Sequence, residues 1–269
     1  MAERISTRPL TDARIRRMHA VLRAALNDCE SLPVNPAAQV KFGKPRKVRP
    51  LLWTAARSER WAETGEIPAK VMVWTPQQCG QFLDSIEELR LYALYHLAAY
   101  YGLRRGELLG LRWPDVDLAT RRLHVRGDVK SEDSDREIVF DEQTAAVLRA
   151  WQQVQRAERL AWGSAWADTG LCFTREDGTT VRPGWVSERF ATLAARAGLP
   201  PVRFHDLRHG SASMLLAAGN SIKVVSGIMG HATSAFTADV YVTVTGELAE
   251  AAAASIAAFV PRKGRASNQ

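Results

Sequence analysis

The residues most able to do chemistry lie in one stretch, RFHDLRHGSASMLLAAGNSIKVVSGIMGHATSAFTADVY, near the end of the chain. Its chemically capable members are His205, Arg208, His231 and Tyr241. Phosphoryl transfer spreads negative charge over the phosphate oxygens, so a protein assists mainly by positioning the phosphate and supplying positive charge. A guanidinium donates paired hydrogen bonds to such oxygens, while a tyrosine phenol, with an ordinary pKa of about 10, needs cations or a base to become a nucleophile. This set of residues therefore predicts attack on a phosphodiester without a metal.

Short helices must position these side chains. Asp206 suits the first turn of a helix that continues through an apolar run to Ala218, and on it His205 and Arg208 would share one face. The glycine and asparagine at 219–220 end this helix, and residues 221–230 predict another, with the second imidazole at its exit. The tyrosine then follows on the next helical segment.

The order HDLRH, then MGH, then a tyrosine ten residues after that histidine resembles the C-terminal signature of the tyrosine recombinase (phage integrase) family. GLRRGELLGLRW, at 102–113, resembles the family's first arginine motif, so that Arg104 would contact the scissile phosphate. Glu107, three residues further, is placed to orient that guanidinium. KSEDSDREI resembles the family's lysine hairpin, a lysine followed six residues later by an arginine, and implies that Lys130 protonates the leaving 5′ oxygen.

The resemblance covers about residues 75 to 260, and implies a mainly α fold with a small antiparallel β-sheet or hairpin. It implies a site-specific DNA recombinase, or integrase, that cuts and rejoins DNA through a 3′-phosphotyrosyl intermediate. No cofactor or metal is expected, because the covalent ester keeps the bond energy. The partners would be double-stranded DNA attachment sites, bound by a homotetramer formed from monomers. The implied catalytic residues are Arg104, Lys130, His205, Arg208, His231 and Tyr241.

Two other functions stay open. A topoisomerase-like enzyme would nick and close DNA with the same residues but without synapsis of two sites. A non-catalytic remnant would bind DNA and form no covalent complex. A zinc site made of His205, His209 and His231 is disfavoured, because no acid or cysteine completes the shell.

Composition is compatible with this interpretation. The chain has 269 residues, 46% of them hydrophobic, and a net charge of +7, which favours a polyanionic partner without distinguishing it from an ordinary basic protein. Three scattered cysteines show no disulfide or zinc spacing and fit a reducing cytosol. No apolar run approaches the length of a membrane span. We therefore expect a cytoplasmic protein, at the bacterial nucleoid or encoded by a phage or other mobile genetic element.

Four regions are expected along the chain. Residues 1–40, with an amphipathic helix over 11–27, resemble only the last part of the family's helical core-binding domain. Residues 41–74 read as a basic linker because charges and prolines begin it, 75–260 as the catalytic domain, and 261–269 as a basic tail. Contacts to the DNA backbone are predicted for basic residues of the first two regions, although a solvated basic surface is the alternative. These residues are Arg14, Arg17, Lys41, Lys44, Arg46, Lys47 and Arg49.

Elsewhere the pattern predicts scaffold. TPQQ at 75–78 has a capping threonine, a proline at the first helical position and a glutamine at the capping-box position. A long helix is expected to run through Leu89, Leu91 and Leu94 and to end near Gly102, and alternation predicts a β-hairpin. The remaining expected elements are hairpin strands at 122–126 and 136–140, helices at 142–160, 183–197 and 247–259, and a strand at 171–174.

Overall fold

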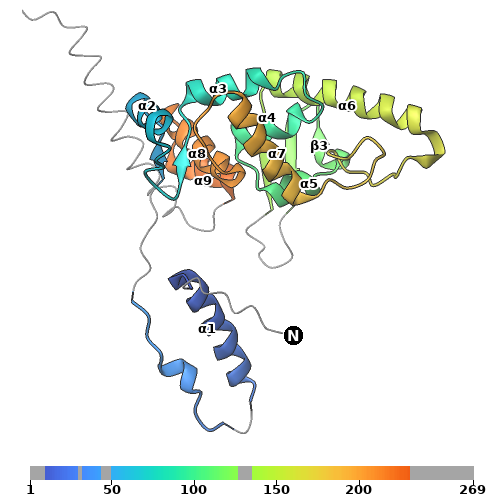
Figure 1. Ribbon diagram of the computed structural model, residues 1–269. Coiled ribbons are helices and arrows are strands. Elements are labelled where there is room, and N and C mark those ends of the chain that lie inside the picture. Colours follow the sequence, from blue (N-terminus) through green and yellow to red (C-terminus); the bar gives the residue numbers. More distant parts are fainter. Residues whose placement is uncertain (1–9, 30–31, 44–49, 127–134, 231–269) are drawn as a thin grey trace, which may run out of the picture. The chain divides into compact units, whose positions relative to one another are not determined.

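The computed structural model describes residues 10–29, 32–43, 50–126 and 135–230, and Figure 1 shows their helices and strands. The chain divides into two compact units, residues 1–48 and residues 49–269. Each unit is described by itself.

The first unit contains the predicted amphipathic helix, α1 (Asp12–Asn27), and a short 3-10 helix, η1 (Pro36–Gln39). The side chain of Asn35 joins them: it accepts from the Ala37 amide at 2.9 Å and donates to the Asn27 side chain at 2.6 Å. Most of the large apolar residues of α1 are nevertheless exposed within the described residues of this unit. They include Ile15, Met18, Val21 and Leu22.

The second unit opens with a pair of short parallel strands, β1 (Leu51–Leu52) and β2 (Met72–Val73), separated by α2 (Ala55–Thr64). Trp53 and Trp74, which follow these strands, are buried, and their indole N–H groups donate to the Pro201 and Pro200 carbonyls at 3.1 and 2.8 Å. The structure thus differs from the linker expected over 41–74. From residue 51 the chain forms regular elements and contributes large aromatic side chains to the core, so the linker does not extend to residue 74.

Helices are the main elements among the described residues of the second unit. Thr75 and Gln78 form the predicted capping box at the start of α3 (Pro76–Ser85). The central helix is α4 (Tyr92–Tyr101), which is buried on nearly all sides and packs against both α6 (Glu142–Trp162) and α8 (Leu207–Ala217) (Figure 1). The remaining helices are α5 (Arg105–Gly110), α7 (Pro183–Arg196) and α9 (Ile222–Met229).

The prediction that the helix ending near Gly102 runs through Leu89 and Leu91 was wrong, because α4 begins only at Tyr92. The chain instead turns tightly after α3, with the Leu89 and Tyr92 amides donating to the Ile86 and Leu89 carbonyls at 2.9 and 2.8 Å. Leu91 is buried and Leu89 is partly buried in this turn rather than on a helix. Tertiary packing has here overridden a helical pattern.

The small sheet contains β3 (Val116–Asp117), β4 (Arg122–Val125) and β5 (Arg136–Val139), antiparallel and in that order. The predicted hairpin is β4 and β5, with Leu123 opposite Ile138, both buried. The expected strand at 171–174 is reduced to isolated bridges, because left-handed glycines at 170 and 178 turn the chain on either side. The architecture agrees with the predicted mainly α fold with a small antiparallel sheet.

None of the helices in the described part of the chain is long and apolar enough to cross a membrane. The expected helix at 247–259 and the tail at 261–269 lie outside the described residues.

Candidate active site

Arg104 and Glu107 lie together at the start of α5. Gly102 ends α4 with a left-handed φ of +60°, so the chain reverses and presents Arg104 as the residue that caps α5. The Arg104 amide donates to Glu107 Oε2 at 2.7 Å, and its guanidinium Nη1 donates to Glu107 Oε1 at 2.6 Å. The contact expected between these two side chains is therefore present in the structure.

Arg208, the second residue of α8, is buried beside them. Its Nη1 donates to the Gly102 carbonyl at 2.7 Å, and its Nη2 donates to the Met229 carbonyl. Burial, followed by the charge of Arg104, lowers the pKa of Arg208 to about 9, although Glu107 opposes the shift. The guanidinium remains charged at neutral pH and is held in a fixed orientation by backbone oxygens.

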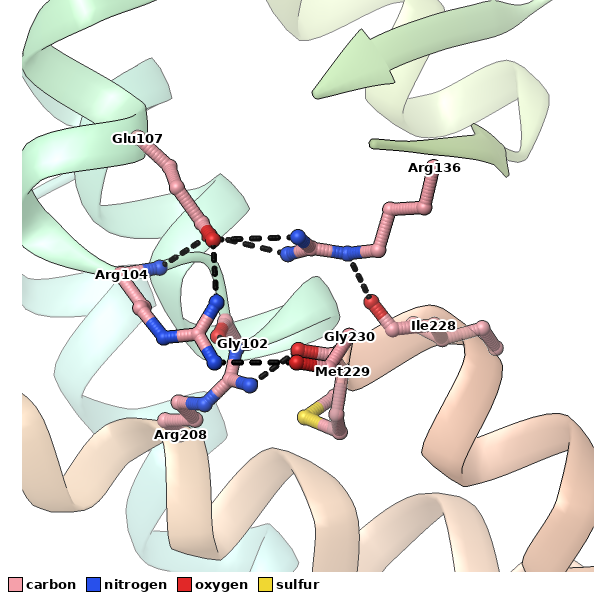
Figure 2. A network of polar contacts seen from close by, with 8 residues as sticks. All are labelled: Gly102, Arg104, Glu107, Arg136, Arg208, Ile228, Met229 and Gly230. Atoms are coloured by element: carbon pink, nitrogen blue, oxygen red, sulfur yellow. Dashed lines mark hydrogen bonds and ion pairs between the residues drawn. The ribbon is translucent and has the colours of Figure 1, made fainter. Parts of the chain in front are cut away.

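A third guanidinium, which the sequence analysis left without a role, completes this group. Arg136, the first residue of β5, donates to both oxygens of Glu107, at 3.0 Å from Nη1 and 2.9 Å from Nη2 (Figure 2). Its Nε donates to the Ile228 carbonyl at 2.7 Å. The only signal in the sequence is that an arginine follows Lys130 by six residues, and this does not say that its partner lies in α5.

The three guanidiniums hold three successive carbonyls at the C-terminal end of α9, where the helix dipole is negative (Figure 2). The carbonyls belong to Ile228, Met229 and Gly230, and their donors, in the same order, are Arg136, Arg208 and Arg104. Arg104, Arg136, Arg208 and Glu107 together are named the arginine cluster. Through these hydrogen bonds, α5, α8 and β5 all contact the C-terminal end of α9.

The charges within the arginine cluster do not balance: Glu107 is its only carboxylate. Burial raises the pKa of Glu107, but the hydrogen bonds and charge of Arg136, followed by the hydrogen bonds of Arg104, outweigh it and set the pKa at about 2. Glu107 is thus ionised at any working pH, and three guanidiniums face one carboxylate. A site with such an excess of positive charge and fork-shaped donors suits a phosphate group.

His205 lies in a 3-10 turn, η5 (Phe204–Asp206), rather than on the α-helix expected to carry both it and Arg208. Asp206 is buried and accepts two hydrogen bonds from Arg203, at 2.6 and 2.7 Å, which hold this tighter turn. His205 is surface-accessible. Partial burial lowers the pKa of its imidazole. The negative charge of Asp206 opposes this shift, and the positive charges of Arg208, Arg203 and Arg104 add to it. A neutral imidazole, able to accept a proton, is the form that this environment favours.

His209 lies on α8 behind His205, with the two rings edge to face at 5.6 Å between centroids. Burial lowers the pKa of His209 to about 4. Within the described ranges no group of three His, Cys, Asp or Glu side chains is arranged to hold a metal ion. His231, the third member of the zinc alternative, lies outside those ranges.

Three predicted catalytic residues, Lys130, His231 and Tyr241, lie outside the described residues. The same holds for four of the predicted DNA contacts, Lys44, Arg46, Lys47 and Arg49. The other three contacts, Arg14, Arg17 and Lys41, are exposed in the first unit. Their neighbour Arg16 instead turns back onto its own unit, over the ring of Phe42 at 4.9 Å and onto the Gly43 carbonyl.

Residues 73–247, more than half of the chain, match the sequence model of the phage integrase family. The chain belongs to this family. The match contains the arginine cluster, the hairpin and the segment with His231 and Tyr241, so the predicted family membership is confirmed.

Among family members, the chain is similar to a XerC-like tyrosine recombinase from Caldanaerobacter subterraneus subsp. tengcongensis, with 28% identity over 200 residues, 65% of this chain and 51% of that protein. It is 34% identical to the tyrosine recombinase XerC of Mycobacterium sp. (strain KMS) over 145 residues, 54% of this chain and 46% of that protein. The chain thus spans about half the length of the curated relatives it matches.

Two solved structures share the fold. The crystal structure of XerA recombinase gives a TM-score of 0.58 at 24% identity, covering 73% of this chain and 68% of that one. The Tn1549 transposon integrase in complex with transposon right end DNA gives a TM-score of 0.62 at 18% identity, covering 90% of this chain and 80% of that one. These likenesses confirm the predicted tyrosine recombinase fold.

Proposed function

We propose that this protein is a tyrosine-type site-specific DNA recombinase, an integrase that cuts and rejoins DNA through a 3′-phosphotyrosyl intermediate. The observation that carries the proposal is the arginine cluster, in which Arg104, Arg136 and Arg208 surround the single carboxylate of Glu107. Membership of the phage integrase family supports the choice of a DNA phosphodiester as the anion.

In the proposed reaction the Tyr241 phenol attacks the scissile phosphorus, its oxygen–phosphorus bond forms and the bond to the 5′ oxygen breaks. His205, whose lowered pKa favours the neutral ring, takes the phenol proton or holds it by a hydrogen bond. Arg104, Arg208 and His231 hold the phosphate oxygens, where negative charge gathers in the transition state. Lys130 gives a proton to the leaving 5′ oxygen. Attack by a 5′ hydroxyl of a partner strand reverses these steps and rejoins the DNA.

The proposed partners are double-stranded DNA attachment sites. The Tn1549 integrase, which shares the fold, was solved with transposon DNA, and the net charge of +7 suits such a polyanion. Strand exchange between two duplexes cuts four strands, so four protomers would assemble on DNA from monomers. The exposed Arg14, Arg17 and Lys41, with the basic residues that follow them, are proposed to contact the backbone, and the reaction to take place in the cytoplasm.

A covalent trapping assay tests the chemistry. The wild-type protein is incubated with a nicked suicide half-site duplex, or with a pool of genomic fragments where the site is unknown, and run on a denaturing gel. A slow protein–DNA band that forms in the presence of a chelator is expected for wild type and absent for Tyr241→Phe. Tyr100→Phe, which removes the hydroxyl of an exposed tyrosine on α4, serves as the matched control and should keep the band.

The same assay separates the alternatives. Binding of a cognate duplex without any covalent band would contradict the proposal and indicate a DNA-binding protein. A band accompanied by relaxation of supercoiled DNA but no joining of two sites would indicate nicking and closing without synapsis. Recombinant products from two sites would support the full proposal.

A further inference from the structure

We infer that Arg136 is a positioning residue for this reaction: it fixes Glu107 against Arg104 and holds the C-terminal end of α9 within the arginine cluster. The inference rests on the proposed function, because it assigns Arg136 a place in that chemistry. The family resemblance places Arg136 in the lysine-hairpin motif but gives it no role.

The first support is the set of hydrogen bonds that the Glu107 carboxylate accepts. Each of its oxygens accepts two hydrogen bonds, one from Arg136 and one from Arg104. The fork of Arg136 therefore sets the plane of the carboxylate, and this plane decides where Glu107 can receive Arg104. Without Arg136 the carboxylate would keep only the two contacts within its own helical turn.

The second support is burial. The Arg136 side chain is 7% exposed, whereas that of Arg104 is 41% exposed. Arg136 also directs Nε, Nη1 and Nη2 at protein acceptors. All three side-chain nitrogens of Arg136 are therefore engaged by Glu107 and by the end of α9, so its effect on the reaction passes through these two neighbours.

The third support is the close packing of Arg136 on Gly230. A Cβ atom at position 230 would lie 2.8 Å from Arg136 Nη1 and 3.0 Å from its Cδ. Together with the hydrogen bond to Ile228, this contact fixes the last turn of α9. His231 is the next residue in the sequence, and Tyr241 follows ten residues later. Arg136 therefore contacts the residue directly before the segment that contains both proposed catalytic side chains.

The kinetic test compares Arg136→Ala and Arg136→Lys with a matched control, Arg90→Ala. Arg90 also forks onto a glutamate, Glu158, and also donates to a carbonyl, but outside the arginine cluster. The rate of covalent complex formation is measured in a single turnover at saturating DNA, with DNA affinity measured separately.

We expect the cleavage rate to fall on the order of ten- to a hundredfold in Arg136→Ala, at unchanged DNA affinity, because the reacting groups are displaced. Arg136→Lys should recover little of the rate, since an ammonium cannot fork, and it serves as the test protein should the alanine variant not fold. Arg90→Ala should keep the wild-type rate. In the double variant with Glu107→Gln the losses should be less than additive, because one of the two routes by which Arg136 acts passes through Glu107.

A rate for the Arg136 variants within about twofold of wild type would overturn the inference, as would an equal loss in Arg90→Ala or losses that add with Glu107→Gln. Failure of the proposed function has a different signature, because wild type itself would then give no covalent band.

Hydrogen exchange provides a test that does not depend on catalysis. In Arg136→Ala, exchange should become faster in the last turn of α9 and the first turn of α5, and stay unchanged in α6. In Arg90→Ala these two turns should exchange as in wild type. Unchanged exchange at both turns in Arg136→Ala would contradict the inference whether or not the protein cleaves DNA.

Discussion

Two glutamates of the second unit each receive a forked arginine, and their surroundings give them different roles. Arg90 donates to both oxygens of Glu158 and, from Nη1, to the Thr174 carbonyl at 2.8 Å. Arg136 donates to both oxygens of Glu107 and, from Nε, to the Ile228 carbonyl at 2.7 Å. The local geometry is nearly the same: one ion pair and one carbonyl, joining segments distant in sequence.

The difference lies in the charges around each pair. Arg90 lies over the ring of Trp151 at 4.9 Å, and its pair consists of one cation and one anion. Glu107 is shared by two arginines, and Arg208 adds a third positive charge beside it. A balanced pair needs nothing further and joins α6 to the chain around it. An unbalanced group of three cations is completed by an anion, and this excess is the feature we connect with phosphate chemistry.

Arg104→Ala should show the largest effect, because it removes the most exposed guanidinium of the arginine cluster. We expect single-turnover cleavage to slow on the order of 10²–10³-fold, the loss typical of one transition-state donor, with little change in the denaturation midpoint. Arg105→Ala is the control: the next side chain donates to the Ser187 hydroxyl at 2.7 Å instead. Equal losses in the two variants would show that position within the arginine cluster does not matter.

Glu107→Gln should change how stability depends on pH. The pKa of Glu107 is about 2 in the folded protein, against an ordinary value of 4.5. A lowered folded pKa contributes stability above pH 4.5, and this contribution is lost as the pH falls toward 2. By linkage it amounts to about 3 kcal/mol. Urea unfolding at several pH values should therefore show wild type exceeding Glu107→Gln near pH 6 and the difference shrinking below pH 4. A difference independent of pH would contradict this assignment.

Local signals in the sequence were sufficient for much of the fold. The capping box at Thr75, the alternating strands of the hairpin and the helical patterns of α6 and α7 depend on neighbours within a few residues. The motif around Arg104 and Glu107 likewise spans one helical turn, so spacing alone predicted that their side chains meet.

Contacts between distant segments were not predictable in this way. Arg136 pairs with residues 29 positions before it and 92 positions after it, and no local pattern specifies either partner. Trp53 and Trp74 donate to carbonyls more than a hundred residues away in the sequence. No local pattern indicates these contacts, and the predicted linker therefore extended too far, to residue 74. The 3-10 turn at His205 depends on the buried Asp206 accepting from Arg203, a contact that the helical pattern does not reveal.

Arg90→Ala tests how much the balanced ion pair of Arg90 and Glu158 contributes to stability. Loss of this guanidinium leaves Glu158 without its donor in a partly buried site, and we expect the free energy of unfolding to fall by roughly 2 kcal/mol. Adding Glu158→Ala should recover part of that loss, because the uncompensated charge is removed. Denaturant midpoints measure both effects. A double variant less stable than the sum of the two single changes would contradict a simple structural pair.

The smallest effect concerns the two glycines that end α2 and α9. Gly65 and Gly230 both have left-handed φ angles, +71° and +60°, so alanine at either position should cost about 1 kcal/mol in backbone strain. A Cβ at Gly65 would meet no atom within 4 Å, whereas one at Gly230 would press on Arg136 at 2.8 Å. Gly230→Ala should therefore lower the free energy of unfolding more than Gly65→Ala does.

Backbone strain affects both glycine variants, so the additional loss of unfolding free energy in Gly230→Ala measures the packing of Gly230 on Arg136. This additional loss should disappear when both alanines are compared in an Arg136→Ala background, because the guanidinium that the new methyl group would displace is then absent. Denaturant midpoints of the four glycine variants decide the point. If the additional loss persists without Arg136, the glycine is required by some other neighbour, and the hold of Arg136 on the end of α9 rests on the Ile228 hydrogen bond alone.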